Sequence, residues 1–123
     1  MKALLIEPNH IPEIIDIKNE IDELCELINC DLIECVYPYK DNVILICDES
    51  GMINGRQIPN RKVNENVIFG PFLLLGVNRK DDFISLTEKQ INKYYKLFYQ
   101  PEVFYIDRNH QISSFKVDSN LFL

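Results

Sequence analysis

Two arginines, Arg56 and Arg61, lie in a polar segment that combines several residue types suited to binding an anion. A guanidinium is a planar fork of N–H donors that fits a phosphate or a carboxylate and keeps its charge at any accessible pH. Neighbouring amide side chains can bond to base edges or to backbone, and a glycine permits close approach of a ligand. We therefore expect a ligand-binding loop, with these candidate residues: Asn54, Gly55, Arg56, Asn60 and Arg61.

A plainer interpretation of the same segment stays open. The segment matches neither the glycine-rich phosphate loop nor the dinucleotide-binding fingerprint, so its residues do not select one ligand. Its asparagines and Gly55 could simply shape turns, while Arg56 and Arg61 pair with the acidic N-terminal half of the chain. Long irregular loops in compact domains are usually functional or disordered, and Pro59 lowers the entropy that binding would cost. These two features favour the binding loop.

Charge is distributed unevenly along the 123 residues. Residues 1–50 contain three Lys or Arg against twelve Asp or Glu, which gives −9, whereas residues 51–123 contain ten against seven, which gives +3. Nucleic-acid binding needs a broad positive surface, so we expect no direct nucleic-acid binding. The acidic half offers a second candidate, a surface that docks on a basic protein partner, unless it is merely a solvated face. Its candidate residues are Glu20, Glu23, Glu26 and Glu34.

Few other residues have the types or spacing of a chemical site. The two histidines, His10 and His110, fall in separate predicted turns, and no nucleophile motif accompanies either one. The four cysteines form no CxxC pair, so we interpret them as reduced thiols that pack as small hydrophobic groups. We therefore expect no enzyme activity, no metal and no cofactor.

The hydrophobic pattern predicts the elements that hold these residues. We expect one domain over residues 1–123 with an α+β fold: a single mixed, mostly antiparallel sheet with two helices packed on it. Between Asp48 and Val67 we expect turns and irregular backbone, including Gln57–Arg61, and at Gly70-Pro71 a bend. The expected strands are Lys2–Glu7, Glu13–Ile17, Leu32–Tyr37, Val43–Asp48, Val67–Val77, Val103–Asp107 and Gln111–Val117.

Two stretches have helical spacing. The first is Asn19–Ile28, with Asn19 as N-cap and a predicted buried stripe that includes Ile21, Leu24 and Ile28. The second follows Thr87, where Gln90 stands at the capping-box position. Its predicted buried residues are Ile91, Tyr94, Tyr95 and Phe98, before Pro101 stops the helix.

The N-terminal apolar run is broken at Glu7 and Pro8, which makes it too short for a signal peptide or a membrane span. We therefore expect a cytoplasmic protein without membrane contact.

Several stretches carry a resemblance to a known family. They are KALLIEP at the N-terminus, NGRQIPNR (Asn54–Arg61), IFGPFLLLG (Ile68–Gly76) and DFISLTEKQINKYYKLFYQPEVF (Asp82–Phe104). They resemble a small family of domains of unknown function encoded by phages, plasmids and conjugative elements of low-GC bacteria. The resemblance spans about residues 1–104, and the C-terminal hairpin and tail, residues 105–123, are less typical. It implies a protein of a mobile element that acts on a component of the bacterial host, and it implies no catalytic residue.

Two functional hypotheses follow from these features. In the first, the chain is a non-enzymatic binding protein that sequesters a small anionic, nucleotide-like ligand of a host pathway through the loop of Arg56 and Arg61. In the second, it is a protein–protein inhibitor of a host defence or nucleic-acid-binding protein and acts through its acidic face. The sequence leaves open whether the chain forms a homo-oligomer.

Overall fold

The computed structural model describes residues 1–118, and the predicted tail 119–123 lies outside the described residues. The helices are α1 (Ile21–Ile28) and α2 (Glu88–Leu97), with one short 3-10 turn, η1 (Ile53–Gly55). The strands are β1 (Lys2–Ile6), β2 (Glu13–Asp16), β3 (Ile33–Val36), β4 (Val43–Asp48), β5 (Pro59–Val63), β6 (Asn66–Phe69), β7 (Phe72–Val77), β8 (Phe83–Ile84), β9 (Glu102–Ile106) and β10 (Ile112–Lys116).

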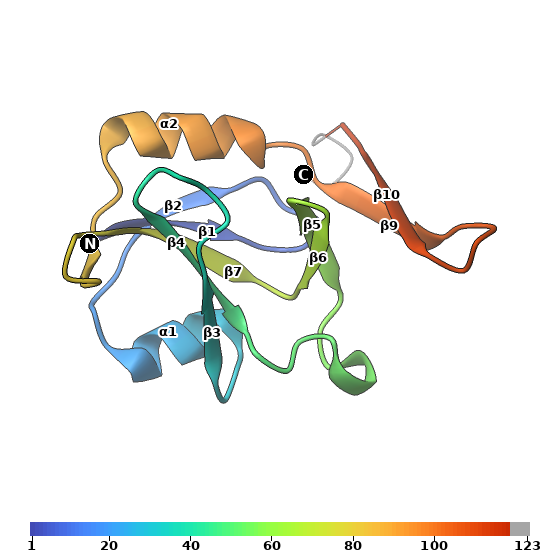
Figure 1. Cartoon of the computed structure of the whole chain (residues 1–123), viewed down its shortest axis with the longest axis horizontal. Helices are drawn as coiled ribbons and strands as arrows, with labels where there is room; N and C mark the ends of the chain where they lie inside the picture. Colours follow the sequence, from blue (N-terminus) through green and yellow to red (C-terminus); the bar gives the residue numbers. More distant parts are fainter. Residues whose placement is uncertain (119–123) are drawn as a thin grey trace.

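A six-stranded sheet forms the centre of the fold. Its strand order is β2-β1-β7-β4-β3, with β8 paired to β7, and all of its described pairs are antiparallel. The pairs β5–β6 and β9–β10 form separate hairpins. Figure 1 shows α2 above the sheet and α1 below it. The α+β prediction is confirmed, and no helix in residues 1–118 is long and apolar enough to cross a membrane.

The sheet has a hydrophobic core on each face, because alternate side chains of its central strands point to opposite sides. On one face, Leu45 and Leu74 pack with Tyr94 and Phe98 from the α2 segment. On the other face, Ile46 packs in the cluster that contains the α1 residues. Strands β4 and β7 are buried along their full length, as their continuous apolar sequences predict.

Strand β3 is less covered than its composition suggests. Apolar runs such as Leu32–Tyr37 are typical of strands covered on both faces, but β3 lies at the edge of the sheet and is only partly buried. The predicted strands Leu32–Tyr37 and Val43–Asp48 are confirmed as β3 and β4, and they pair with Glu34 opposite Cys47 in the register. The sequence pattern failed here because an apolar run does not reveal whether a further strand or helix will cover its outer side.

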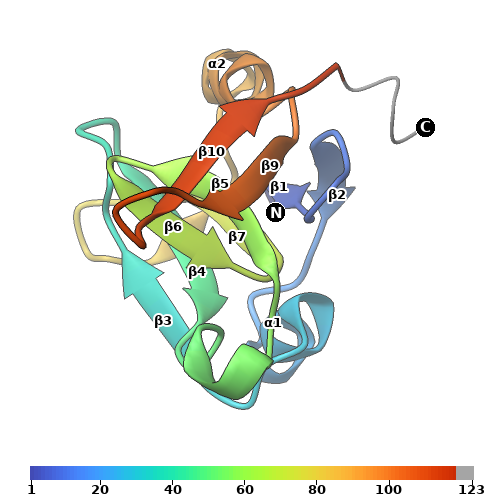
Figure 2. The ribbon, with the colours of Figure 1, turned by 90° about the vertical axis from the view of Figure 1, so that its right-hand side faces the viewer.

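The predicted irregular segment Gln57–Arg61 is also different. Pro59 begins strand β5, where its missing N–H is tolerated, and the β5–β6 register shifts between Pro59 and Arg61. The predicted bend at Gly70 is confirmed, but the single predicted strand Val67–Val77 is wrong, because the bend divides it into β6 of the β5–β6 hairpin and β7 of the central sheet. Gly70 has φ 83°, and a Cβ there would lie 2.7 Å from the Gln57 side chain. Only glycine meets both requirements without strain. Figure 2 shows the resulting β5–β6 hairpin in front of β4 and β7.

The first helix begins later than its sequence indicated. The N-cap is Glu20 rather than Asn19, and it makes no side-chain capping bond. Leu24 and Ile28 are buried as predicted, but Ile21 is 58% exposed because it occupies the first helical position, beyond the sheet contact.

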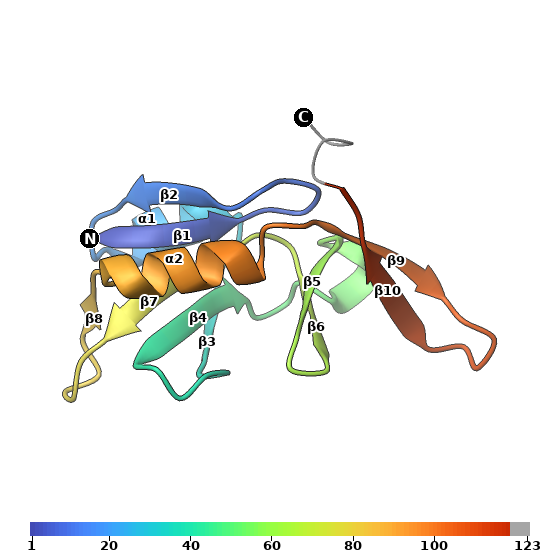
Figure 3. The ribbon, with the colours of Figure 1, turned by 90° about the horizontal axis from the view of Figure 1, so that it is seen from above.

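The second helix follows its prediction closely. Thr87 Oγ1 accepts from the Gln90 N–H at 3.1 Å, and Gln90 Oε1 accepts from the Thr87 N–H at 2.9 Å, which completes the capping box. The helix ends at Leu97, ahead of Pro101. The C-terminal hairpin β9–β10 then runs away from the sheet, as Figure 3 shows.

We predict that Thr87→Ala lowers the free energy of unfolding by about 1 kcal/mol, because the N–H of Gln90 loses its acceptor. Urea unfolding measures this loss. The matched control is Asn92→Ala on the exposed side of α2, which removes a poorer helix former and should not destabilise the fold. Equal midpoints for wild type and Thr87→Ala would contradict the capping role.

Candidate functional site

Arg61 is the most deeply buried of the candidate ligand-binding residues, with 0% exposure. Its Nη2 donates to the carbonyl of His10 at 2.6 Å and to that of Phe98 at 3.0 Å. Its Nη1 donates to Asn60 Oδ1 at 2.8 Å. Burial lowers the pKa of Arg61 to about 10, with a smaller opposing effect from the charge of Glu102. The guanidinium therefore donates its hydrogen bonds to acceptors inside the fold and is not exposed to solvent.

Asn60 belongs to the same internal network. Its Nδ2 donates to the carbonyl of Ile6 at 2.9 Å and to that of Gly70 at 2.8 Å, and the residue is 1% exposed. Asn60 therefore joins β1 and the Gly70 bend to β5. Its amide satisfies buried backbone carbonyls, whose desolvation would otherwise cost free energy.

Arg56 points to a different part of the molecule. Its Nε donates to Asp48 Oδ2 at 2.9 Å, and its Nη2 donates to the carbonyl of Asn29 at 3.3 Å, just after α1. Gln57 Nε2 donates to the same Asp48 oxygen at 3.2 Å. The side chain of Arg56 is 37% exposed, whereas that of Asp48 is 1% exposed. Arg56 and Gln57 thus fasten the η1 segment to β4 and to the end of α1.

The Asp48 carboxylate titrates at lower pH than usual. Burial by itself raises the pKa of Asp48. This effect is outweighed by hydrogen bonds from Arg56, the Ser50 N–H and Gln57 and by the positive charge of Arg56, so the pKa lies below its ordinary value. The carboxylate therefore stays ionised in the folded state and balances the charge of Arg56.

The remaining two loop candidates lie in η1. Gly55 is exposed with φ 67°, a conformation that favours glycine, and no atom lies within 4 Å of a Cβ placed there. Asn54 belongs to η1, and its side chain lies outside the described part of the chain. The structure therefore brings Asn60 and Arg61 together in the core but turns Arg56 toward Asp48. No shared anion site forms between the two arginines.

The acidic candidates separate into two surfaces. Glu20, Glu23 and Glu26 line a shallow hollow on α1 together with Asp22 and Leu27. Among residues 1–118, no ion pair or side-chain hydrogen bond joins any of these α1 carboxylates. We call this hollow and its carboxylates the α1 acidic surface.

Glu34 does not belong to the α1 acidic surface. It pairs across β3–β4 with Cys47, and Cys47 lies in the core cluster on the α2 side of the sheet. Directly opposed residues of an antiparallel pair share one face, so Glu34 also points to the α2 side. There it lines a groove between β3 and β6.

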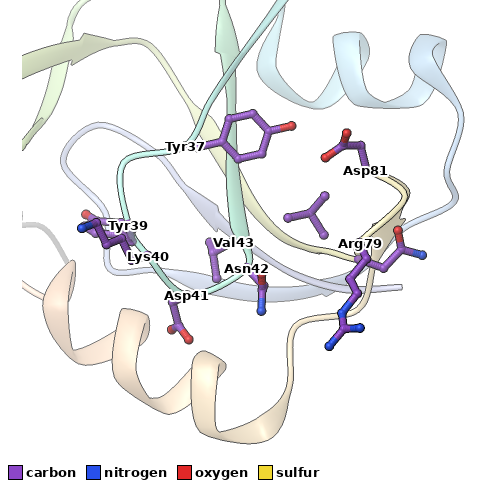
Figure 4. A pocket seen from close by; sticks show the side chains of 10 residues that line it. Tyr37, Tyr39, Lys40, Asp41, Asn42, Val43, Arg79 and Asp81 are labelled. Carbon is purple, nitrogen blue, oxygen red and sulfur yellow. The ribbon is translucent and has the colours of Figure 1, made fainter.

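One further cavity was not singled out by its sequence. It has a volume of about 510 Å³ and lies between the β3–β4 and β7–β8 connections. Figure 4 shows Arg79 and Asp81 on the β7–β8 connection, and Tyr37 and Asp41 on the β3–β4 connection. The sequence predicts no helix or strand in either connection, and nothing in it indicates that the two connections meet.

The four cysteines are free thiols. Burial raises the pKa of Cys30 and of Cys47 to about 12, with smaller contributions from Cys25 and from Glu34 respectively. Within residues 1–118 no group of three or more His, Cys, Asp or Glu residues is arranged to hold a metal ion.

Residues 1–99 match the model of a family described as Domain of unknown function (DUF3846). The chain belongs to the DUF3846 family. Its match covers the main sheet and both helices and ends before β9, so the β9–β10 hairpin lies beyond the part that matches. No curated protein matches the chain, and no solved structure does either.

We predict that Arg61→Met lowers the free energy of unfolding of this DUF3846 protein by more than about 3 kcal/mol. The substitution leaves the buried carbonyl of Phe98 and the partly buried carbonyls of His10 and Glu7 without this donor, and a buried group left unsatisfied costs about 1–3 kcal/mol. Urea unfolding is the measurement. Arg79→Met is the control at an exposed arginine and should stay within about 0.5 kcal/mol of wild type. A loss below about 1 kcal/mol for Arg61→Met would show that the network is dispensable.

A second prediction concerns acid stability. The pKa of Asp48 is lower in the folded chain than its ordinary 3.8, so its contribution to stability is present above 3.8 and is lost as the pH falls below that value. Asp48→Asn should be less stable than wild type near neutral pH and lose less stability between about pH 5 and pH 3. Urea unfolding across this range tests it. An Asp48→Asn variant with the wild-type pH dependence would refute the role of Asp48.

Proposed function

We propose that the chain is a non-enzymatic protein-binding domain that docks on a basic surface of a partner protein. The observation that carries the proposal is the α1 acidic surface, whose carboxylates make no ion pair with the rest of the described chain. Such charges steer a basic partner and exclude acidic ones. Leu27 adds an apolar group within the same hollow.

The geometry gives less support to a small anionic ligand. Arg61 is buried and donates its hydrogen bonds to backbone carbonyl groups, and Arg56 forms an ion pair with Asp48. Arg79 makes no ion pair with another described residue, and it lines its cavity together with Lys40, but Asp41 and Asp81 line the same cavity. The two positive and two negative charges offset each other, so the cavity does not select an anion. A binding protein for basic proteins fits the charges better.

The setting of the proposed partner comes from the family resemblance. The stretches NGRQIPNR and IFGPFLLLG resemble those of domains carried by phages, plasmids and conjugative elements of low-GC bacteria. A protein of such an element that acts in the cytoplasm would meet host nucleic-acid-binding proteins, whose basic surfaces suit an acidic inhibitor. The partner class that we propose is therefore a host protein with a basic, nucleic-acid-binding surface, in a defence pathway or otherwise.

The test is a triple charge reversal, Glu20→Lys with Glu23→Lys and Glu26→Lys. The wild-type chain is immobilised, and mass spectrometry identifies and quantifies the proteins that it retains from a lysate of a low-GC bacterium. Isothermal titration calorimetry then measures the affinity of each retained protein for the wild type and for the variant. We expect the triple variant to weaken binding of the specific partner more than tenfold and the affinity of wild type to fall with added salt.

The matched control reverses three exposed carboxylates outside α1, Glu13, Glu65 and Glu88, and so changes the net charge by the same amount. It should retain the partner within about threefold, because the charges lie away from the docking surface. Equal loss in both variants would show only general charge attraction and would refute the proposal. A nucleotide that raises the melting temperature of wild type would instead favour the small-ligand hypothesis.

A further inference from the structure

The outer edge of β3 is open to an additional strand. Strand β3 ends the order β2-β1-β7-β4-β3, and the Glu49 N–H donates to the Leu32 carbonyl at 3.1 Å at the start of the β3–β4 ladder. Backbone groups of an antiparallel strand alternate between its two sides. The groups of Ile33 and Cys35 therefore point outward, and within residues 1–118 no hydrogen bond from outside the sheet reaches them.

A groove runs beside this edge on the α2 side of the sheet. It consists of two hollows of about 460 Å³ and 190 Å³, which share the lining residues Glu34, Cys47, Val67 and Ile68. The first hollow ends at the Asn64 side chain, which donates to the Pro38 carbonyl and so ties the β5–β6 turn to the β3–β4 loop. The two hollows thus form one open groove in which apolar side chains such as Val67 and Ile68 alternate with polar ones.

The charge of the groove is entirely acidic. Glu34, Asp48 and Glu49 line it, and no Lys or Arg does. Arg56 balances Asp48, but among the described residues no ion pair involves Glu34 or Glu49. A basic side chain opposite Glu34 would therefore form a favourable cross-strand pair.

We propose that β3 binds an extended, basic segment of a partner protein as an added strand, with a Lys or Arg side chain placed over Glu34 and apolar neighbours in the groove. Main-chain hydrogen bonds to Ile33 and Cys35 hold the segment, and the groove selects its side chains. Like charges oppose the pairing of this edge with a second copy of the chain, since both edges carry Glu34. The inference rests on the proposed function, because it names the segment that a basic partner presents, but it uses a surface distinct from α1.

The experiment selects peptides from a random nonapeptide library displayed on phage, with full-length wild-type chain as bait. We expect enrichment of peptides in which Lys or Arg alternates with apolar residues. A selected peptide is synthesised, and calorimetry measures its Kd. Glu34→Lys should raise the Kd at least tenfold. Cys35→Pro removes an outward N–H and should do the same, whereas Cys35→Ser keeps the N–H and should leave the Kd within twofold.

Two controls separate this site from others. Glu13→Lys makes the same charge change on β2, the opposite edge of the sheet, and should leave the Kd within twofold. The α1 triple reversal should also preserve peptide binding, so a failure of the α1 proposal is distinguishable from a failure at β3. Circular dichroism checks the fold of each variant, and Glu34→Lys keeps the test decisive if Cys35→Pro does not fold.

Several outcomes would overturn the inference. One is a failure to enrich any basic peptide, and another is an affinity unchanged by both Glu34→Lys and Cys35→Pro. A third is peptide binding lost only in the α1 triple reversal, which would place the site on α1. A fourth is a concentration-dependent dimer in light scattering that Cys35→Pro abolishes, because the edge would then pair with a second copy of this chain.

Discussion

The buried guanidinium of Arg61 connects parts of the chain that are far apart in sequence. It donates to carbonyl groups of His10 in the β1–β2 turn and of Phe98 at the end of α2, and it receives support from Asn60 on its own strand. A charge removed from water is costly unless hydrogen bonds replace its hydration. The arrangement supplies these bonds mainly from backbone carbonyls. Strand β5 is therefore held against β1 and α2 although only Val63 of β5 belongs to the hydrophobic core.

The same network extends to the C-terminal hairpin. Next to Arg61, the Lys62 N–H donates to Glu102 Oε2 at 2.9 Å, and Glu102 Oε1 accepts from Ser114 Oγ at 2.9 Å. A two-stranded hairpin is marginally stable in water by itself. Glu102 thus anchors β9 and β10 to β5, and part of the order of this hairpin depends on the strand that Arg61 holds.

Arg61 and Arg56 bond to internal acceptors, so they add little positive charge to the outer surface. Carboxylates dominate two parts of the described surface. One part is the α1 acidic surface, and the other is the groove between β3 and β6. The two lie on opposite sides of the sheet, since Glu34 shares the face of Cys47 and α1 covers the other face. A basic partner that wraps around the β3 edge could contact both.

Local patterns in the sequence determined much of this fold. Strands β1, β2, β4 and β7, the capped helix α2 and the last hairpin follow from period, capping residues and turn residues, which act between near neighbours. The tertiary structure alone decided the rest. It buried Arg61 and exposed Ile21, and it left β3 at an edge, because each outcome depends on which distant segment covers a residue. The sequence shows that an arginine is present but not which acceptor its guanidinium will bond to. The Phe98 carbonyl lies 37 residues from Arg61 along the chain, and only the tertiary structure brings the two together.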